Sequence, residues 1–292
     1  MAAGSQTCFE GIAIQNFYVF LEQSKQHEIL LPHLHDILLP EFERIGAGKS
    51  SLDVLGVGSG AGEMDVEMLS LLQSVFPAVP ITADIVEGSI QLTDSFKALV
   101  AKMASLQKIS FAWHIMSSED YEKQVKAQEE MKKFDFIHMI HVVYYFENLD
   151  EALRFHHSLL KNNGRLLIVV TAASSGWVPL WKTCLIKELC AGTDIDKPKV
   201  TSGDVTACLK SQGLKYDEYV FPNSFDITEC FNPDSTTGES LFSFMTSRSH
   251  LSQSFTPDIR AGILDVLRNK SSTIKDGRVF FNSTFSCIVV HA

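Results

Sequence analysis

The chain has 292 residues, of which 45% are hydrophobic and 21% are charged, as in an ordinary globular protein. Its formal net charge of −10 argues against a nucleic-acid substrate, because contacts to phosphate need Lys and Arg. The sequence has no membrane-spanning apolar run, no signal-peptide pattern at its start, and six dispersed cysteines without a CxxC pair. We therefore expect a reduced, cytoplasmic protein with no nucleic-acid or membrane partner.

The first part of the chain carries apolar residues at helical spacing between positions 15 and 45. Pro32 is expected to separate two helices there, and Pro40 to start or kink another. Residues 46–50 form a short break before the core.

The central part alternates between apolar runs and amphipathic segments. We expect strands at 52–57, 81–87, 108–114 and 165–170, and a strand that runs into an aromatic loop at 135–146. Helices are expected at 63–76, 89–103, 117–133 and 149–160. Ser117 or Ser118 is a natural N-cap, and residues 162–164 (Asn-Asn-Gly) are expected to end the last of these helices. This alternation predicts an α/β fold with a doubly wound, mostly parallel sheet.

The pattern changes after Thr171, where two tryptophans four residues apart have no clear element of their own. We then expect a helix at 201–212, a strand at 214–221, helices at 240–249 and 257–268, and a last strand with a bulge at Asn282–Ser283. The domain prediction is a single domain, 1–292. It comprises N-terminal helices (1–46) that close the site, a cofactor-binding core (47–171), a substrate-side elaboration (172–274) and the last strand (275–292).

A glycine-rich turn follows the first predicted strand, with Gly58, Gly60 and Gly62 at alternate positions. A dinucleotide fingerprint would need its third glycine where Glu63 stands, and a phosphate-binding G-x-x-x-x-G-K-[ST] is absent. The turn, with Asp53 upstream, resembles motif I of the S-adenosylmethionine-dependent methyltransferases, whose cofactor is cationic at sulfur and suits an acidic loop. Glu87, at the end of the next strand, can accept both ribose hydroxyls, or it simply caps a helix.

The ligand edge of such a sheet lies at the carboxyl ends of its strands. Gly58, Glu87, Ser118, Ile140 and His141 all fall at predicted strand ends. His138 and His141 are three residues apart on a predicted strand, so they point to opposite faces and cannot both ligate one ion. We therefore expect no metal site.

Several segments together resemble the histamine N-methyltransferase family. They are GxGAGExDxxxL at Gly58, FAWH at Phe111, DFIHMI at Asp135, VYYF at Val143, SSGWxxLWK at Ser174, GLKY at Gly213 and FFNSTFSCIVVHA at Phe280. The similarity runs from about Phe17 to Ala292. It implies a class I (Rossmann-like) methyltransferase with a seven-stranded sheet and an added substrate-binding region. It also implies a cytosolic monomer that uses S-adenosylmethionine to methylate an imidazole nitrogen of a small molecule.

The resemblance also implies the cofactor site. Gly58 lies in the loop, Glu87 binds the ribose, Ser118 lies near the adenine and Ile140 packs against the cofactor. A further contact, a glutamine in the family, falls on Leu92 here, while the neighbouring Gln91 faces elsewhere on the helix.

The substrate side departs further from the family. The family's amine-binding glutamate becomes Gln26, its ring-contacting glutamine becomes His141, and its C-terminal asparagine becomes Ser283. An N-terminal tyrosine becomes Ala13. The family's aromatic residues are kept, and they fit either a cation–π box for a flat ring or plain hydrophobic core: Tyr144, Tyr145, Trp177, Trp181 and Phe244.

These changes concern the tail of the substrate. Without the glutamate, a desolvated ammonium would lack its partner, and Ala13 opens space, so we expect a longer substrate whose tail is not an amine. Carnosine, converted to anserine, is the favoured substrate. Histamine is the alternative, with Glu28 substituting for the shifted carboxylate, and a protein methyltransferase or a catalytically inactive binding protein are the rivals.

The expected reaction is in-line displacement at the methyl group by the free nitrogen of a neutral imidazole, held within about 3–3.5 Å of the methyl carbon. His141 is the candidate catalytic residue, because it can orient the N–H of the substrate ring or accept its proton. The alternative for His141 is a strand histidine bonded to nearby backbone.

Overall fold

The computed structural model describes residues 11–184, 199–246 and 256–292. The chain forms two compact units, each built from several stretches of sequence. The first, here called the aromatic unit, contains residues 1–26, 171–203 and 220–286, and the second, the sheet unit, contains residues 27–170, 204–219 and 287–292. No helix in the described residues has the length and apolar character needed to cross a membrane.

A seven-stranded sheet has the order β3-β2-β1-β4-β5-β10-β6, and the pairs β3–β2, β2–β1, β1–β4 and β4–β5 are parallel. This confirms the expected doubly wound, mostly parallel sheet. The strands are β1 (Leu52–Val57), β2 (Ile81–Val86), β3 (Ser110–His114), β4 (Phe134–Ile140), β5 (Leu160–Thr171), β6 (Tyr216–Phe221) and β10 (Phe285–His291).

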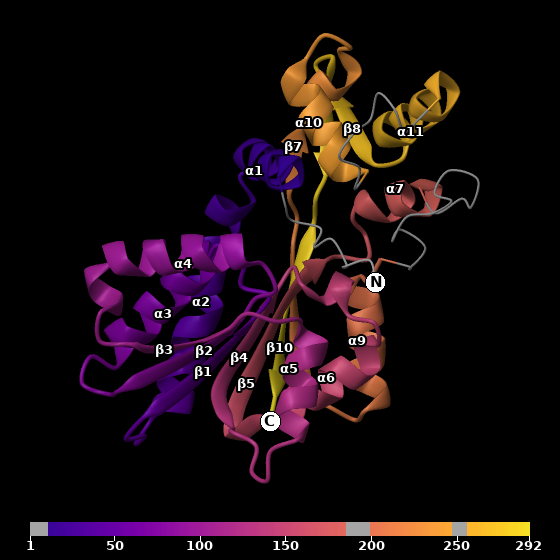
Figure 1. Cartoon of the computed structure of the whole chain (residues 1–292). Helices are drawn as coiled ribbons and strands as arrows, with labels where there is room; N and C mark the ends of the chain where they lie inside the picture. The colour runs from indigo at the N-terminus through magenta and orange to yellow at the C-terminus, as the bar shows by residue number, and fades with distance from the viewer. Residues whose placement is uncertain (1–10, 185–198, 247–255) are drawn as a thin grey trace, which may run out of the picture. The chain divides into compact units, whose positions relative to one another are not determined.

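Helices cover both faces of this sheet, with α2, α3 and α4 on one side and α5, α6 and α9 on the other (Figure 1). Their bounds are α2 (Gln26–Gly46), α3 (Glu63–Val75), α4 (Ile90–Lys102), α5 (Ser118–Lys126), α6 (Leu149–Ser158) and α9 (Ser202–Ser211). Because both faces are covered, β1, β2 and β4 are buried along nearly their whole length, which is why they read as apolar runs.

The aromatic unit contains α1 (Ile12–Ser24), α7 (Trp177–Cys184), α10 (Thr236–Met245), α11 (Pro257–Asn269) and a three-stranded sheet of β7 (Ser224–Asp226), β9 (Arg278–Asn282) and β8 (Ser272–Lys275). Its core is an apolar cluster that includes Phe20, Leu180, Phe242 and Phe281. Short 3₁₀ helices lie at Ala104–Leu106 and Val143–Tyr145 in the sheet unit and at Thr228–Phe231 in the aromatic unit.

The expected break at Pro32 is wrong. The first helix ends instead at Lys25, which adopts a left-handed conformation (φ 52°) and donates its N–H to the Leu21 carbonyl. Both Pro32 and Pro40 lie inside α2. A proline in a helix interior costs about 3 kcal/mol, and the burial of one apolar face of α2, including Leu34 and Phe42, offsets that cost.

Two helix ends also differ from expectation. The helix expected at 149–160 ends at Ser158, and residues 162–164 belong to β5 rather than to a helix cap. The helix expected at 117–133 ends at Lys126, with Ser117 as its N-cap. Lys132, which follows it, reaches into a charged cluster on the sheet. The helix expected at 240–249 begins earlier, at Thr236, and residues 247–249 lie outside the described ranges.

The expected single last strand with a bulge is two strands in two sheets. β9 pairs with β7 and β8, whereas β10 lies in the seven-stranded sheet. Asn282 ends the first strand, because its side-chain oxygen accepts hydrogen bonds from the backbone N–H and the hydroxyl of Thr284, at 3.0 and 2.6 Å. Such a side-chain turn competes with strand pairing and directs the chain from one sheet to the other.

Candidate functional site

The carboxyl ends of β3, β2, β1 and β4 lie side by side at one edge of the sheet, since these strands are adjacent and parallel. The segments that leave this edge carry Ser118, Glu87, Gly58 and His141, and Ile140 is the last residue of β4. The structure therefore brings together the residues predicted at strand ends. Ligands bind at this edge in open α/β sheets.

The glycine-rich turn runs from β1 into α3 and is left-handed at Gly58 and Gly60, with φ values of 64° and 59°. A Cβ atom added to Gly58 would lie 2.2 Å from the side chain of Val142, so the turn packs against the loop after β4. A Cβ atom added to Gly60 would meet no heavy atom within 4 Å. The backbone at Gly60 is thus open to the close approach of a ligand.

Glu87 joins the glycine turn to the end of β2. Its two carboxyl oxygens accept hydrogen bonds from the backbone N–H groups of Gly60 and Ser89, each at 2.8 Å. Ser89, rather than Glu87, is the N-cap of α4, because its hydroxyl accepts from the N–H of Leu92. A carboxylate has about four acceptor positions, so a half-buried Glu87 can still accept hydroxyl groups of a ligand.

The remaining predicted cofactor residues lie on the same unit. Leu92 is buried on α4, while the neighbouring Gln91 is exposed. Ser118 is the first residue of α5 and is half-buried, as is Ile140. Beside the turn, burial raises the pKa of the Glu63 carboxyl, and the neighbouring Asp65 adds to this effect.

Asp53, which the sequence associated with the glycine turn, lies at the other end of β1. Its carboxyl group contacts Lys161 Nζ at 2.6 Å and accepts a hydrogen bond from the Thr82 hydroxyl at 2.5 Å. Burial alone would raise the pKa of Asp53, but the hydrogen bonds from Lys161 and Thr82 and the positive charges nearby hold it below its ordinary value. Asp53 therefore belongs to a charged cluster on the sheet.

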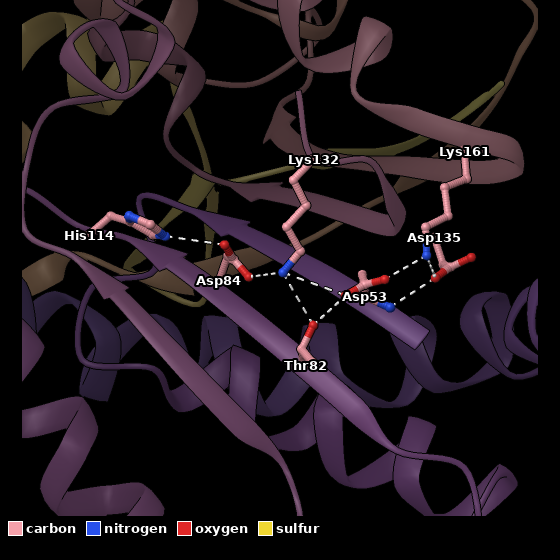
Figure 2. Close-up of polar contacts among 7 residues, drawn as sticks. All are labelled: Asp53, Thr82, Asp84, His114, Lys132, Asp135 and Lys161. Atoms are coloured by element: carbon pink, nitrogen blue, oxygen red, sulfur yellow. Dashed lines mark hydrogen bonds and ion pairs between the residues drawn. The ribbon is translucent and has the colours of Figure 1, made fainter. Parts of the chain in front are cut away.

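This cluster, drawn in Figure 2, has members on β1, β2, β3, β4 and β5. Lys132 Nζ lies 2.6 Å from Asp84 and 3.5 Å from Asp53, and Lys161 Nζ lies 2.8 Å from the buried Asp135. His114 Nε2 is 3.2 Å from the other oxygen of Asp84. Opposite charges alternate through this set, so its carboxyl groups are paired within the cluster.

His141 has an unusual environment directly after β4. Its backbone is left-handed (φ 53°), which is uncommon for a residue other than glycine and is often found at functional sites. Its Nδ1 lies 3.0 Å from the Tyr144 hydroxyl, and its buried Nε2 has no hydrogen-bond partner. Burial, with a smaller contribution from His27, lowers the pKa of His141 to about 3. His141 is therefore neutral at physiological pH.

The aromatic residues predicted for the substrate are divided between the two units. Tyr144 and Tyr145 lie on the sheet unit, and the ring of Tyr145 is 44% exposed. The aromatic unit contains Trp177, Trp181 and Phe244, which are half-buried. The two tryptophan rings stack at 5.7 Å, and Trp177 also packs edge-on against Phe281 at 5.0 Å. One side of Trp177 thus belongs to the hydrophobic core.

The predicted tail-binding residues are also on the aromatic unit. Gln26 is half-buried, and Ser283 is 6% exposed with a hydroxyl that has no hydrogen-bond partner. Glu28, the alternative to Gln26, is exposed and belongs to the sheet unit. Among residues 11–184, 199–246 and 256–292, no group of three or more His, Cys, Asp or Glu residues is arranged to hold a metal ion.

Sequence reasoning missed a buried polar set beneath the glycine turn, formed by Ser59, Asp65 and His138. Asp65 and His138 are each only 2% exposed. The sequence signal for this set is a polar residue at a position where the hydrophobic pattern predicts an apolar one. His138 interrupts the apolar run FDFIHMI, and Asp65 lies on the buried face of α3. His27, which acts on His141, was missed as well.

The known proteins that this chain resembles in sequence are methyltransferases. A family model described as a methyltransferase domain matches residues 30–217. Histamine N-methyltransferase of Xenopus tropicalis is 38% identical over 283 residues, which cover 95% of this chain and 94% of the relative. Carnosine N-methyltransferase 2 of Gallus gallus is 36% identical over 280 residues, with coverage of 96% and 86%.

Solved structures share the fold at low sequence identity. The YcgJ protein of Bacillus subtilis has a TM-score of 0.56 at 14% identity, covering 89% of this chain and 97% of that one. A putative methyltransferase of Bacillus halodurans has a TM-score of 0.55 at 15% identity, with coverage of 87% and 97%. The seven-stranded sheet is thus the class I methyltransferase sheet, as expected.

Proposed function

Because this chain belongs to the histamine N-methyltransferase family, and is a methyltransferase, we propose that it transfers a methyl group from S-adenosylmethionine to an imidazole nitrogen of a small histidine-derived molecule. The observation that carries the proposal is the edge formed by the ends of β1, β2 and β4, where the open turn at Gly60, the carboxyl group of Glu87 and the neutral His141 follow adjacent strands.

The residues at this edge fit the methyl donor. The backbone at Gly60 leaves room for a close ligand, and Glu87 retains acceptor positions for ribose hydroxyls. Ser118 and Ile140 would flank the adenine and the body of the donor, as the family resemblance implies. The donor supplies an electrophilic methyl group attached to a cationic sulfur, and the acidic residues around the turn suit that charge.

His141 would orient the substrate ring. A neutral imidazole has one N–H and one acceptor nitrogen, and the buried Nε2 of His141 has no partner within the chain. With Nδ1 as the protonated nitrogen, facing the Tyr144 oxygen, Nε2 can accept the N–H of a substrate imidazole. The ring's other nitrogen is then the one with a free lone pair for attack on the methyl group.

The low pKa of His141, about 3, favours this orienting role over proton acceptance. A base of that strength takes a proton poorly from a methylated imidazolium ring, whereas hydrogen-bond acceptance needs no change of charge. The product can release its proton to water after it leaves.

We favour carnosine as the substrate, which would give anserine. Gln26 cannot neutralise an ammonium group, and the unpartnered hydroxyl of the buried Ser283 can contribute a hydrogen bond to a carboxylate-bearing tail. The Gallus gallus relative, named a carnosine N-methyltransferase, supports this choice. Histamine is the second candidate, supported by the names of the Xenopus relatives and by the exposed carboxyl group of Glu28.

The catalytic assignment is tested by His141→Ala. We expect turnover to fall at least about a hundredfold while the affinity for S-adenosylhomocysteine, measured by calorimetry, changes little. His141→Gln, which restores the glutamine of the family, is the matched variant and should regain part of the turnover. If His141→Ala turns over at the original rate, His141 has no part in the mechanism.

Binding of S-adenosylhomocysteine to the unsubstituted protein separates an enzyme from an inactive family member that acts as a binding protein. We expect saturable binding at one site. We also propose that the enzyme acts as a cytoplasmic monomer, without nucleic-acid or membrane partners, which light scattering on the purified protein would check for the oligomeric state.

A further inference from the structure

A buried polar cluster lies beneath the glycine-rich turn and takes no part in the ligand contacts described above. The Ser59 hydroxyl donates a hydrogen bond to Asp65 Oδ1 at 2.7 Å, and His138 Nε2 lies 3.2 Å from the same oxygen. Asp65 and His138 are almost fully buried. The three residues come from the turn, from the first turn of α3 and from β4, so the cluster ties together three elements of the sheet unit.

Gly56 provides the space for this cluster. It lies on β1 directly opposite His138 on β4. A Cβ atom added to Gly56 would lie 2.5 Å from Ser59 Oγ, 2.7 Å from Asp65 Oδ1 and 2.9 Å from the His138 ring. These distances are shorter than ordinary Cβ contacts, so a side chain at position 56 would have to displace the polar groups that converge over this strand position.

The cluster determines the path of the turn. A buried carboxyl group is costly unless it is bonded, and here Oδ1 of Asp65 accepts a hydrogen bond from the Ser59 hydroxyl and lies 3.2 Å from His138 Nε2, which itself makes no hydrogen bond. Ser59 stands between the left-handed Gly58 and Gly60, which have little intrinsic preference for this conformation. The hydrogen bond to Asp65 therefore fixes a segment that glycines alone would leave adaptable, and the next residue, Gly60, donates its N–H to Glu87.

We propose that Asp65 is a positioning residue for the methyl-donor site. Held between Ser59 and His138, its carboxyl group keeps the turn in the conformation that brings Gly60 to Glu87 and leaves both accessible to the donor. Asp65 acts through the turn and does not itself contact substrate or donor. The inference rests on the proposed function of this edge and adds the group that organises it.

The test is Asp65→Asn, which keeps the size of the side chain and replaces the charged acceptor of the Ser59 hydroxyl with a weaker, neutral one. We expect the dissociation constant of S-adenosylhomocysteine, measured by calorimetry, to rise about tenfold or more, and the KM for the methyl donor to rise in parallel. At saturating donor, kcat and the KM for the imidazole substrate should stay within about twofold. A purely structural role would lower the melting temperature without this separation of donor KM from kcat.

Two further variants keep the test decisive. Ser59→Ala removes the donor of this hydrogen bond altogether, from the half-buried turn side, so it tests the inference even if Asp65→Asn folds poorly or keeps the bond to its amide oxygen, and we expect a rise in the same dissociation constant. His156→Gln is the matched control, because His156 is a buried histidine bonded within α6 to the Ala152 carbonyl at 2.8 Å. It should alter stability and leave donor binding unchanged.

Donor affinity within twofold of the unsubstituted protein in both Asp65→Asn and Ser59→Ala overturns the inference and leaves the proposed function intact. Absence of donor binding by the unsubstituted protein refutes the proposed function itself, and this inference with it. The two failures are thus distinguished in one set of titrations.

Discussion

Replacement of Asp53 by asparagine separates the charged cluster of Figure 2 from the donor site. Asparagine can still accept the hydrogen bond from Thr82, but it loses the charge that faces Lys161 at 2.6 Å and Lys132 at 3.5 Å. A hydrogen bond to a charged group contributes about 1.5–3 kcal/mol. Because the side chains of Asp53 and Lys161 are 20% and 27% exposed, solvent screening reduces the contribution of their hydrogen bond. We expect a loss of about 1–2 kcal/mol in the free energy of unfolding.

The assay is urea unfolding of both proteins between pH 3 and pH 7. The pKa of Asp53 is lower in the folded state than in the unfolded state, where it is about 3.9. The contribution of Asp53 to the free energy of unfolding is therefore fully present above the unfolded-state pKa, and it is lost as the pH falls through the folded-state pKa. The difference in the free energy of unfolding between the two proteins should therefore be constant near neutral pH and shrink below about pH 4.

Each residue of a strand adds about 3.3 Å to its length, so Asp53 is about 16 Å along β1 from Gly58. Affinity for S-adenosylhomocysteine should not change. Unaltered stability combined with tenfold weaker donor binding would refute the assignment of Asp53 to the cluster.

Two other predictions concern the donor edge. Gly62→Ala should destabilise the protein by about 2–4 kcal/mol in thermal or urea unfolding. The reason is that Gly62 has a φ of 82° and that an added Cβ would lie 2.1 Å from the Phe96 ring. Wild-type stability in that variant would contradict the packing of the turn against α4. Tyr144→Phe removes the hydroxyl that lies 3.0 Å from His141 Nδ1, so kcat should fall about tenfold at unchanged donor affinity; an unchanged kcat would show that Tyr144 does not orient His141.

The sequence was sufficient to locate the edge of the sheet at which the proposed donor residues lie. β1, β2 and β4 are buried on both faces, so their apolar runs are visible in the sequence, and glycines at left-handed positions mark the turn that follows β1. Once the strands were placed, the parallel order fixed which residues share an edge. Gly58, Glu87, Ser118 and Ile140 could therefore be placed at one edge of the sheet before any contact was known, whereas their roles toward the methyl donor stay a prediction.

Other features depend on tertiary contacts that no local pattern reports. Asp53 is close to the glycine turn in sequence, but strand direction puts it among Lys132 and Lys161 at distances set by the sheet. The strand that ends at Asn282 and the one that starts at Phe285 are nearly continuous in the sequence, and the side-chain turn at Asn282 lies where the chain passes from one sheet to the other.

The helix break at Lys25 was missed for a different reason. Pro32 is the stronger helix-breaking signal in the sequence, but burial of one face of α2 outweighs the cost of its two interior prolines. A lysine in a left-handed cap has no comparable sequence signature, because glycine and asparagine are the residues that usually adopt it.

The most direct measurement is mass spectrometry of the products formed by purified protein from S-adenosylmethionine and equal amounts of histamine, carnosine and free histidine. The proposed function predicts that a methyl group appears on an imidazole nitrogen and that methylated carnosine dominates. Dominant methylhistamine would contradict the role given to Gln26 and Ser283 in choosing the tail. Absence of any methylated imidazole, in a protein that binds the donor, would contradict the central claim.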